Sequence, residues 1–221
     1  LQGLIGWWMV KSGLSEQTLK HRVENNQEIR VSAYRLATHL TMAFTTYVLL
    51  LWTGMDHVNW KNIKDFAVQN KEQVAQYAKK YTKLRHFALF NTGLVFTTAV
   101  SGAFVAGNDA GRAYNTFPKM GDDWTPSKDV LLELQPVYRN LFENTAMVQL
   151  DHRILALSTL TSIWTMYLGL KMKQNVGNVF SYKHLPRLSQ IGITAMTHAA
   201  TLQVGLGIAT LLNYVPLSLA V

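Results

Sequence analysis

The sequence predicts an all-α protein, a polytopic bundle of transmembrane helices. Two observations lead to this prediction: apolar and charged residues are strongly segregated along the chain, and the charges gather in the connections. A helix needs about 20 apolar residues to cross the hydrocarbon core of a bilayer. Four segments have this length and character, so a soluble globular fold is not expected. They are Leu36 to Gly54, Phe87 to Gly107, Met147 to Leu170 and Leu188 to Tyr214.

The opening residues, LQGLIGWWMV, are predicted to be the end of a fifth span that starts before residue 1. They have no basic leader and no small-residue cleavage site, so a cleaved signal peptide is not expected. The 221 residues include no cysteine, which excludes disulfides and ligation of haem or an iron–sulfur cluster by a thiolate of this chain. Any metal ligand must then be a histidine, methionine, tyrosine or carboxylate.

The distribution of basic residues predicts the topology. Residues 55 to 86 carry seven Lys or Arg against three acids, and residues 171 to 187 carry four against none, whereas residues 108 to 146 carry four against six. Because basic loops stay on the side from which helices are inserted, the two basic connections are expected on the matrix or cytoplasmic face and the acidic one outside. The net charge of +8 is thus explained without nucleic acid, which is not an expected partner.

Two histidines are the strongest candidates for metal ligation. In this topology His39 and His152 lie at similar depth near the outer ends of two spans. An ionisable residue within a span is a functional candidate by default. Arg35 precedes His39 by four residues, on the same helix face, and Arg153 directly follows His152. Each span therefore presents an imidazole just inside the apolar layer and a guanidinium near its edge.

This pairing favours haem over zinc or copper. A zinc site needs three or four converging ligands, and the chain has no HExxH or paired-histidine spacing. A haem needs one axial imidazole from each of two helices, an apolar slot, and cations for its propionates. The alternative for His39 and His152 is an interfacial side chain bonded to a neighbouring helix or to headgroups. His198, mid-span among threonines, is explained equally well by an interhelical hydrogen bond.

A short internal repeat indicates a duplicated bundle. The opening LQGLIGWWMV is similar to LQVGLGIATL at residues 202 to 211, with Gln2 and Gly6 corresponding to Gln203 and Gly207. Both copies sit in spans predicted to run outward, and the span after the first copy bears His39. Since repeats of this kind indicate duplication, a helix resembling the His39 span is expected just after residue 221.

Five segments of the chain, taken in order, resemble haem A synthase of the mitochondrial and alphaproteobacterial type. They are GWWMVKSGL, RVSAYRLATHL, SGAFVAGNDAGRAYNTFPKMGDDW, FENTAMVQLDHRILAL and QVGLGIATLLNYVPLSLA. The resemblance covers nearly the whole chain, leaving only residues of about 55 to 84 and 171 to 190 without a diagnostic motif. It implies eight transmembrane helices in two pseudosymmetric four-helix halves, of which about five helices are present here. Each half would hold a haem between two histidines near the outer face.

The resemblance implies roles for the two histidines. His39 matches a haem-iron ligand of the N-terminal half, where the C8 methyl of haem O would be oxidised to a formyl group to give haem A for cytochrome c oxidase. His152 matches a ligand of the haem b in the C-terminal half. Oxidation of an unactivated methyl is cofactor chemistry, so the task of the protein would be to hold iron, exclude water and deliver electrons.

The neighbouring polar residues take roles on the same basis. Arg153 and Arg35 would neutralise haem propionates. Asp151 would accept a hydrogen bond that orients the side chain of either His152 or Arg153. Gln149 stands where the other half of the family has a glutamate thought to be catalytic; that glutamate and a partner histidine are expected in helices before residue 1. No catalytic residue is therefore assigned within the chain, and the 221 residues alone are expected to be inactive.

The implied organisation has three parts. Residues 1–54 would be the last two helices of the N-terminal half, 55–86 a basic inside connecting loop, and 87–221 the C-terminal half without its last helix. The implied partners are haem O as substrate, haem b as cofactor, the lipid bilayer and a ferredoxin as electron donor, with haem O synthase and a second copy of the chain as further candidates. The expected location is the mitochondrial inner membrane, with the bacterial plasma membrane as the alternative.

Two other functions stay open from the residues alone. A membrane b-type cytochrome that only transfers electrons would show the same histidines but form no product. A non-haem assembly or transport protein would use the same bundle without iron. Comparing the haem extracted from cells with and without the complete protein distinguishes the electron-transfer cytochrome from the synthase. A haemochrome assay on the purified protein distinguishes the non-haem protein from both.

Overall fold

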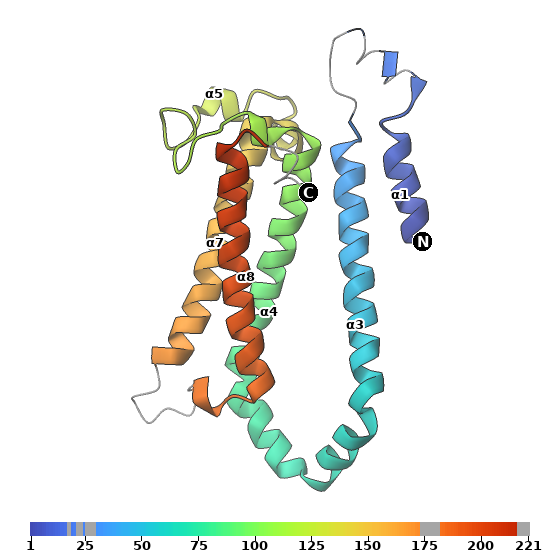
Figure 1. Cartoon of the computed structure of the whole chain (residues 1–221), viewed down its shortest axis with the longest axis vertical. Helices are drawn as coiled ribbons and strands as arrows, with labels where there is room; N and C mark the ends of the chain where they lie inside the picture. Colours follow the sequence, from blue (N-terminus) through green and yellow to red (C-terminus); the bar gives the residue numbers. More distant parts are fainter. Residues whose placement is uncertain (17–18, 21–23, 25–29, 173–181, 216–221) are drawn as a thin grey trace. The chain divides into compact units, whose positions relative to one another are not determined.

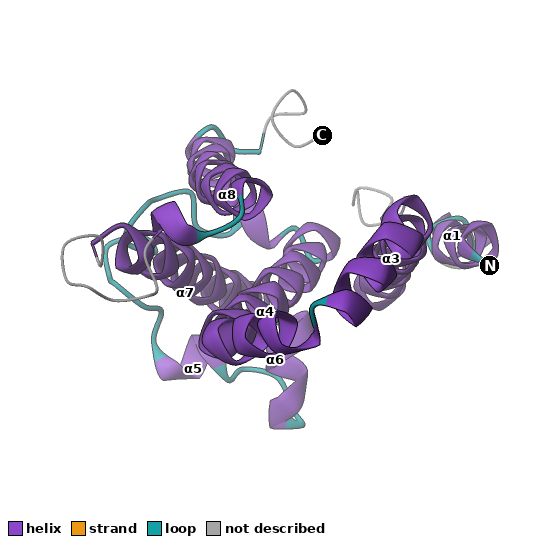
Figure 2. Ribbon diagram, turned by 90° about the horizontal axis from the view of Figure 1, so that it is seen from below, coloured by secondary structure: helices purple, strands orange, loops and turns teal. Residues whose placement is uncertain are grey.

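The computed structural model describes residues 1–221 except 17–18, 21–23, 25–29, 173–181 and 216–221. This described part is helical, and Figure 2 shows helices and connecting loops without a strand. One isolated bridge joins Met120 and Asp123. The predicted all-α fold is confirmed. Lys173, in the second basic connection, lies outside the described residues.

Five helices correspond to the five predicted spans. They are α1 (Gln2–Lys11), α3 (Ala33–Gln69), α4 (Lys71–Gly107), α7 (Thr145–Met172) and α8 (Arg187–Leu212), coloured in chain order in Figure 1. In the part of the chain that the structure describes, three stretches are both long and apolar enough to cross a membrane: Ala33–His57, Tyr81–Gly107 and Arg187–Leu212. The 28 residues of α7 are long enough, but its first turns carry four polar or charged groups between Gln149 and Arg153, which lower its hydropathy.

The basic connection predicted at residues 55 to 86 is helical rather than a loop. α3 continues to Gln69, and α4 begins at Lys71. The segment contains neither Gly nor Pro and is rich in Lys, Gln and Ala, which favour helix. A helix can therefore continue past the apolar layer without a change of backbone. The charge asymmetry that predicts the topology does not depend on this difference.

The described chain divides into two compact units. Unit 1 comprises Leu1–Ala43, Phe96–Leu157 and Leu202–Val221, and unit 2 comprises Phe44–Val95 and Ser158–Thr201. His39, His152 and the connection from 108 to 146 belong to unit 1, whereas His198 belongs to unit 2. Both units draw on several helices, and the division of the chain into two sequential halves stays a prediction.

Unit 2 has a small apolar core with polar ties between its helices. Met166, Leu170 and Leu185 are buried at its centre. The partly buried side chains packed against them are Tyr81, Leu84, Phe87, Tyr182, Ile193 and Met196. The Tyr182 hydroxyl lies 2.6 Å from Oγ1 of Thr194, and Nε1 of Trp164 donates to Oγ1 of Thr201 at 3.1 Å. Such hydrogen bonds pair polar side chains with one another, because lipid chains offer them no hydrogen-bond partner.

Large apolar side chains are exposed along α3. Residues 48 to 52, which read Val, Leu, Leu, Leu and Trp, expose between 49% and 67% of their surface. A run of this kind on a water-soluble protein would be an aggregation hazard. On a helix long enough to cross a bilayer, it is the surface that lipid chains cover.

In unit 1, the long connection between α4 and α7 folds into short helical turns at the ends of these helices (Figure 1). The turns are η1 (Ala110–Arg112), α5 (Lys128–Leu131), η2 (Val137–Arg139) and α6 (Asn140–Glu143). The amide of Asn115 donates to the carbonyl of Leu211 at 2.8 Å, which ties the connection to the end of α8. The connection is therefore a folded cap on this unit.

Candidate functional site

His39 lies on α3 with its ring against α1. A Cβ atom built on Gly6 would lie 3.1 Å from Cε1 of the imidazole, so the glycine leaves the space that the ring uses. Gln2, one turn earlier on α1, places its amide nitrogen 3.2 Å from Nδ1 of His39 and donates to the His39 carbonyl at 3.1 Å. The ring is thus held from one side by a glycine and a glutamine of the neighbouring helix.

His152 lies on α7 with its ring against α4 in a similar way. A Cβ atom built on Gly102 would lie 3.2 Å from Cε1 of this imidazole. Ser101, the residue before it, places Oγ 2.7 Å from Nδ1 of His152 and donates to the carbonyl of Thr98 at 2.8 Å. The ring is only partly exposed.

The two histidines therefore share one local arrangement. In each, a neighbouring helix supplies a glycine under the ring and a polar side chain at Nδ1. Among the described residues, Nε2 of neither ring has a hydrogen-bond partner. A metal-ligating histidine commonly has its other ring nitrogen held by a hydrogen bond, which fixes the ring and its tautomer. The His152 ring is thus arranged in a way that suits ligation through Nε2, whereas the group at Nδ1 of His39 is an amide nitrogen, which only donates.

Arg153, predicted to bind a haem propionate, forms hydrogen bonds to the connection between α4 and α7. Its two terminal nitrogens donate to backbone carbonyls of residues 114, 116 and 119 at 3.0, 2.9 and 3.0 Å, with a longer contact of 3.5 Å to residue 118. Its Nε is buried and has no partner in the described part of the chain. One N–H of this guanidinium thus stays available for an anion.

Arg35 is also engaged within the protein. NH1 of Arg35 donates to the carbonyl of Trp8 at 2.9 Å, and the guanidinium lies 4.5 Å from the centre of the Trp8 ring. The structure therefore places both predicted arginines near the histidine-bearing turns, but their main partners are α1 and the connection. Their assignment to propionates stays a prediction.

Gln149 lies one turn before Arg153 on the buried side of α7. Its side chain is 3% exposed, and its amide nitrogen donates to the carbonyl of Tyr114 at 3.0 Å, the same carbonyl that Arg153 binds. Its Oε1 is buried and has no partner among the described residues. Buried polar atoms are normally paired, so this oxygen and Nε of Arg153 are two polar atoms that the described residues leave unsatisfied. The polar side chain at Nδ1 of His152 is that of Ser101, and the orienting role expected of Asp151 stays a prediction.

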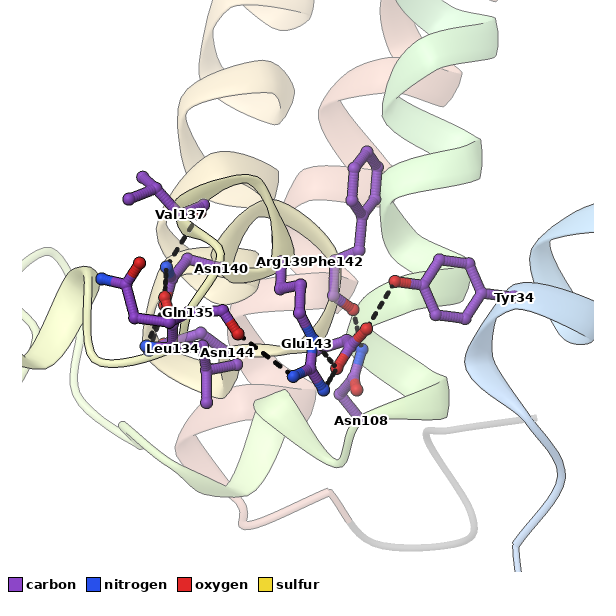
Figure 3. Close-up of polar contacts among 10 residues, drawn as sticks. All are labelled: Tyr34, Asn108, Leu134, Gln135, Val137, Arg139, Asn140, Phe142, Glu143 and Asn144. Atoms are coloured by element: carbon purple, nitrogen blue, oxygen red, sulfur yellow. Dashed lines mark hydrogen bonds and ion pairs between the residues drawn. The ribbon is translucent and has the colours of Figure 1, made fainter.

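Two buried asparagines shape the connection beside the site. Asn140, with no exposed surface, donates to the carbonyls of Leu134 and Val137 at 2.9 Å and accepts from the Leu134 amide at 3.0 Å. Asn144 donates to the Val130 carbonyl at 2.8 Å, and its Oδ1 accepts from the amide of residue 147 at 3.0 Å in the first turn of α7. These bonds, several of which appear in Figure 3, fix the entry into the helix that bears His152.

A polar cluster joins the start of α3 to this connection. The Tyr34 hydroxyl donates to Oε1 of Glu143 at 2.8 Å, and Arg139 donates to Oε2 of the same carboxylate through Nε at 3.0 Å and through NH2. These three residues lie together in Figure 3. Asn108 donates to the carbonyl of Phe142 at 2.8 Å. An ion pair between Arg30 and Asp109 adds a second tie. The segments bearing His39 and His152 are thus linked within unit 1.

The charge on Glu143 is favoured by its partners. The hydrogen bonds from Arg139 and then from Tyr34 lower the pKa of this carboxyl from its ordinary value of 4.5, against a smaller opposing effect of burial. The same pair raises the already high pKa of Arg139. Both groups are therefore ionised at neutral pH, and the pair persists over the physiological range.

The small and polar partners of the rings were the residues that sequence reasoning did not assign. Gln2 and Gly6 were noted only because they recur as Gln203 and Gly207, yet they are the residues that contact His39. A Cβ atom built on Gly207 meets nothing within 4 Å among the described residues. His198 is exposed and belongs to unit 2, whereas His39 and His152 belong to unit 1.

Comparison with known proteins adds a decisive observation. The COX15-CtaA family, described as "Cytochrome oxidase assembly protein", matches residues 1–221. The chain belongs to this family. No solved structure matches the chain. The expected resemblance to haem A synthase is confirmed at the level of the COX15-CtaA family.

Three relatives show the range of this family. The chain is 44% identical to "Heme A synthase COX15" of Arabidopsis thaliana, with 99% of the chain and 42% of the relative aligned. It is 38% identical to "Heme A synthase-mitochondrial ferredoxin fusion protein" of Schizosaccharomyces pombe (100% and 36%), and 38% identical to "Heme A synthase" of Nitrosomonas eutropha (100% and 52%). The chain thus spans about half, or less, of the length of these relatives. With three stretches among the described residues able to cross a membrane, the chain fits a multi-pass protein of the mitochondrial inner or bacterial plasma membrane.

Proposed function

We propose that this protein is a haem A synthase that oxidises the C8 methyl of haem O to a formyl group, supplying haem A to cytochrome c oxidase. His39 would ligate the iron of the substrate haem, and His152 that of a haem b. The observation that carries the proposal is the repeated arrangement of two imidazoles in a chain whose relatives bear this name: each has a polar side chain at Nδ1 and, within the described part of the chain, no hydrogen-bond partner at Nε2.

The residues present suit a haem. Axial ligation requires one imidazole per helix and not a cluster of side chains. Gly6 and Gly102 let the rings lie close against the neighbouring helices, and Nε of Arg153 is a buried donor that a propionate would satisfy. Arg35 would contribute a second positive charge near the substrate haem. The haem iron would supply the redox chemistry, while these residues bind, orient and shield it.

The proposed electron donor is a ferredoxin. A relative from Schizosaccharomyces pombe is named as a fusion with mitochondrial ferredoxin, which supports direct transfer between the two proteins. The basic residues between 55 and 86 lie on the face predicted to be in the matrix. The 221 residues by themselves are expected to form no haem A, because they contribute one imidazole to each proposed iron and no assigned catalytic carboxylate.

The test uses the protein expressed from its complete reading frame in cells that make haem O. His39→Ala should abolish haem A in extracted haem, whereas His152→Ala should mainly deplete haem b and lower activity indirectly. His86→Ala, an exposed histidine near the start of the second apolar stretch, is the matched control and should change neither haem. Normal haem A from His39→Ala would refute its assignment. If the wild-type protein shows both haem signals but the cells contain no haem A, the protein is instead an electron-transfer cytochrome.

A further inference from the structure

We propose that Ser101 is a positioning residue for His152: its hydroxyl holds Nδ1–H of the ring and thereby presents an unprotonated Nε2 to iron. The inference rests on the proposed function, since it names the group that prepares the haem ligand. Ser101 lies on α4, 51 residues before His152 in the sequence, and its Oγ is 2.7 Å from Nδ1.

The direction of this hydrogen bond follows from counting protons. A serine hydroxyl has one proton to donate and lone pairs that accept. Oγ of Ser101 donates that proton to the carbonyl of Thr98 at 2.8 Å. Both short contacts of Oγ are hydrogen bonds at the same time only if Nδ1 of His152 is the donor. A neutral imidazole that carries its proton on Nδ1 has its lone pair on Nε2.

The neighbouring residue completes the arrangement. Gly102 follows Ser101 directly, and a Cβ atom there would lie 3.2 Å from Cε1 of the ring. The glycine therefore lets the ring approach α4 closely enough for the serine to reach Nδ1. Among the described residues no side chain contacts Nε2 through a hydrogen bond, so no protein group competes with iron for the nitrogen that this tautomer leaves unprotonated.

An acceptor at Nδ1–H has a measurable effect on a bound metal. It orients the ring and raises the basicity of the ligand, which favours the oxidised metal. Removing the hydroxyl should therefore shift the midpoint potential of the haem at His152 to a more positive value and change its low-spin spectrum. A serine that only packs or caps its own helix would affect neither quantity.

The experiment compares four variants of the protein, expressed from its complete reading frame with its haem. Ser101→Ala is expected to raise the midpoint potential of the low-spin haem and alter its electron paramagnetic resonance signature, and Ser101→Thr, which keeps a hydroxyl, is expected to restore both toward wild type. Thr92→Ala removes a hydroxyl whose partner among the described residues is the Ala88 carbonyl of the same helix, and it should change nothing. His152→Ala should remove this haem signal.

The outcomes separate the inference from the proposed function. If the signal depends on His152 but Ser101→Ala leaves its potential and spectrum unchanged, the inference is wrong and the ligand assignment stands. If the signal survives His152→Ala, the proposed ligand itself is wrong and the inference falls with it. If Ser101→Ala loses the haem altogether, recovery in Ser101→Thr supports the hydroxyl, and loss in both variants contradicts it.

Discussion

Replacing Gly102 by alanine adds one methyl group between α4 and the His152 ring. The new Cβ would lie 3.2 Å from Cε1, whereas carbon atoms make ordinary contact from about 3.5 Å. The ring must therefore move by about 0.3 Å or more. This displacement acts on an imidazole that is held at Nδ1 by a hydrogen bond of 2.7 Å to Ser101. We expect the substitution to weaken haem binding at this site.

The effect on stability combines two opposing contributions. Overpacking of this kind costs about 1–3 kcal/mol, and alanine in place of a helical glycine contributes about 1 kcal/mol of stabilisation. The free energy of unfolding of Gly102→Ala should then fall by up to about 2 kcal/mol. Gly93→Ala on the same helix is the matched control, because a Cβ there meets nothing within 4 Å among the described residues. The control should be unchanged or stabilised by up to about 1 kcal/mol.

The assay is thermal unfolding in detergent together with the absorption of the low-spin haem, measured on both variants of the complete protein. Gly102→Ala should unfold at a lower temperature than Gly93→Ala and carry less haem b or an altered spectrum. Equal haem content, equal spectra and equal stability in the two variants would refute the reasoning, because they would show that the ring does not depend on the space above Gly102.

Two further predictions concern charged groups. The lowered pKa of Glu143 means that its ionised form stabilises the fold above pH 4.5, and that this contribution is lost as the pH falls through the lower value of the folded protein. The melting temperature should therefore drop less steeply below pH 4.5 in Glu143→Gln than in wild type, while Glu133→Gln, an exposed glutamate of the same connection, should follow wild type. Reversing Lys79 and Lys83 to glutamate should slow reduction by ferredoxin most strongly at low ionic strength, because exposed basic side chains steer an acidic partner. Lys128→Glu, on the connection predicted to lie outside, should leave that rate unchanged.

The positions of the long helices could be predicted because a bilayer imposes a length and a composition. The ranges from Leu36, Phe87 and Leu188 all fall within helices that are apolar enough to cross. The helix ends within residues 55 to 86 were predicted less well. Hydropathy indicates where a segment leaves the apolar layer of the membrane, but it does not indicate where the helix ends. The absence of Gly and Pro in this segment was the signal for a continued helix.

The candidate ligands could also be predicted, but not their surroundings. His39 and His152 stood out because ionisable groups are rare within apolar segments. Arg153 was assigned to a haem edge because it follows His152, yet four of its contacts are to backbone carbonyls of a connection more than 30 residues earlier. A contact between segments so far apart leaves no pattern in a single sequence.

The two histidines share a glycine and a polar partner, but the partners differ in what they can accept. Ser101 can accept Nδ1–H of His152, so this ring is ready to bind iron through Nε2. Gln2 approaches Nδ1 of His39 with its amide nitrogen, which only donates, while its oxygen is buried without a partner among the described residues. Ligation through Nε2 of His39 would thus require the Gln2 amide to turn its oxygen toward the ring. Under the proposed function this is the site that exchanges substrate for product, and a ligand that must reorganise to bind is also one that can be released.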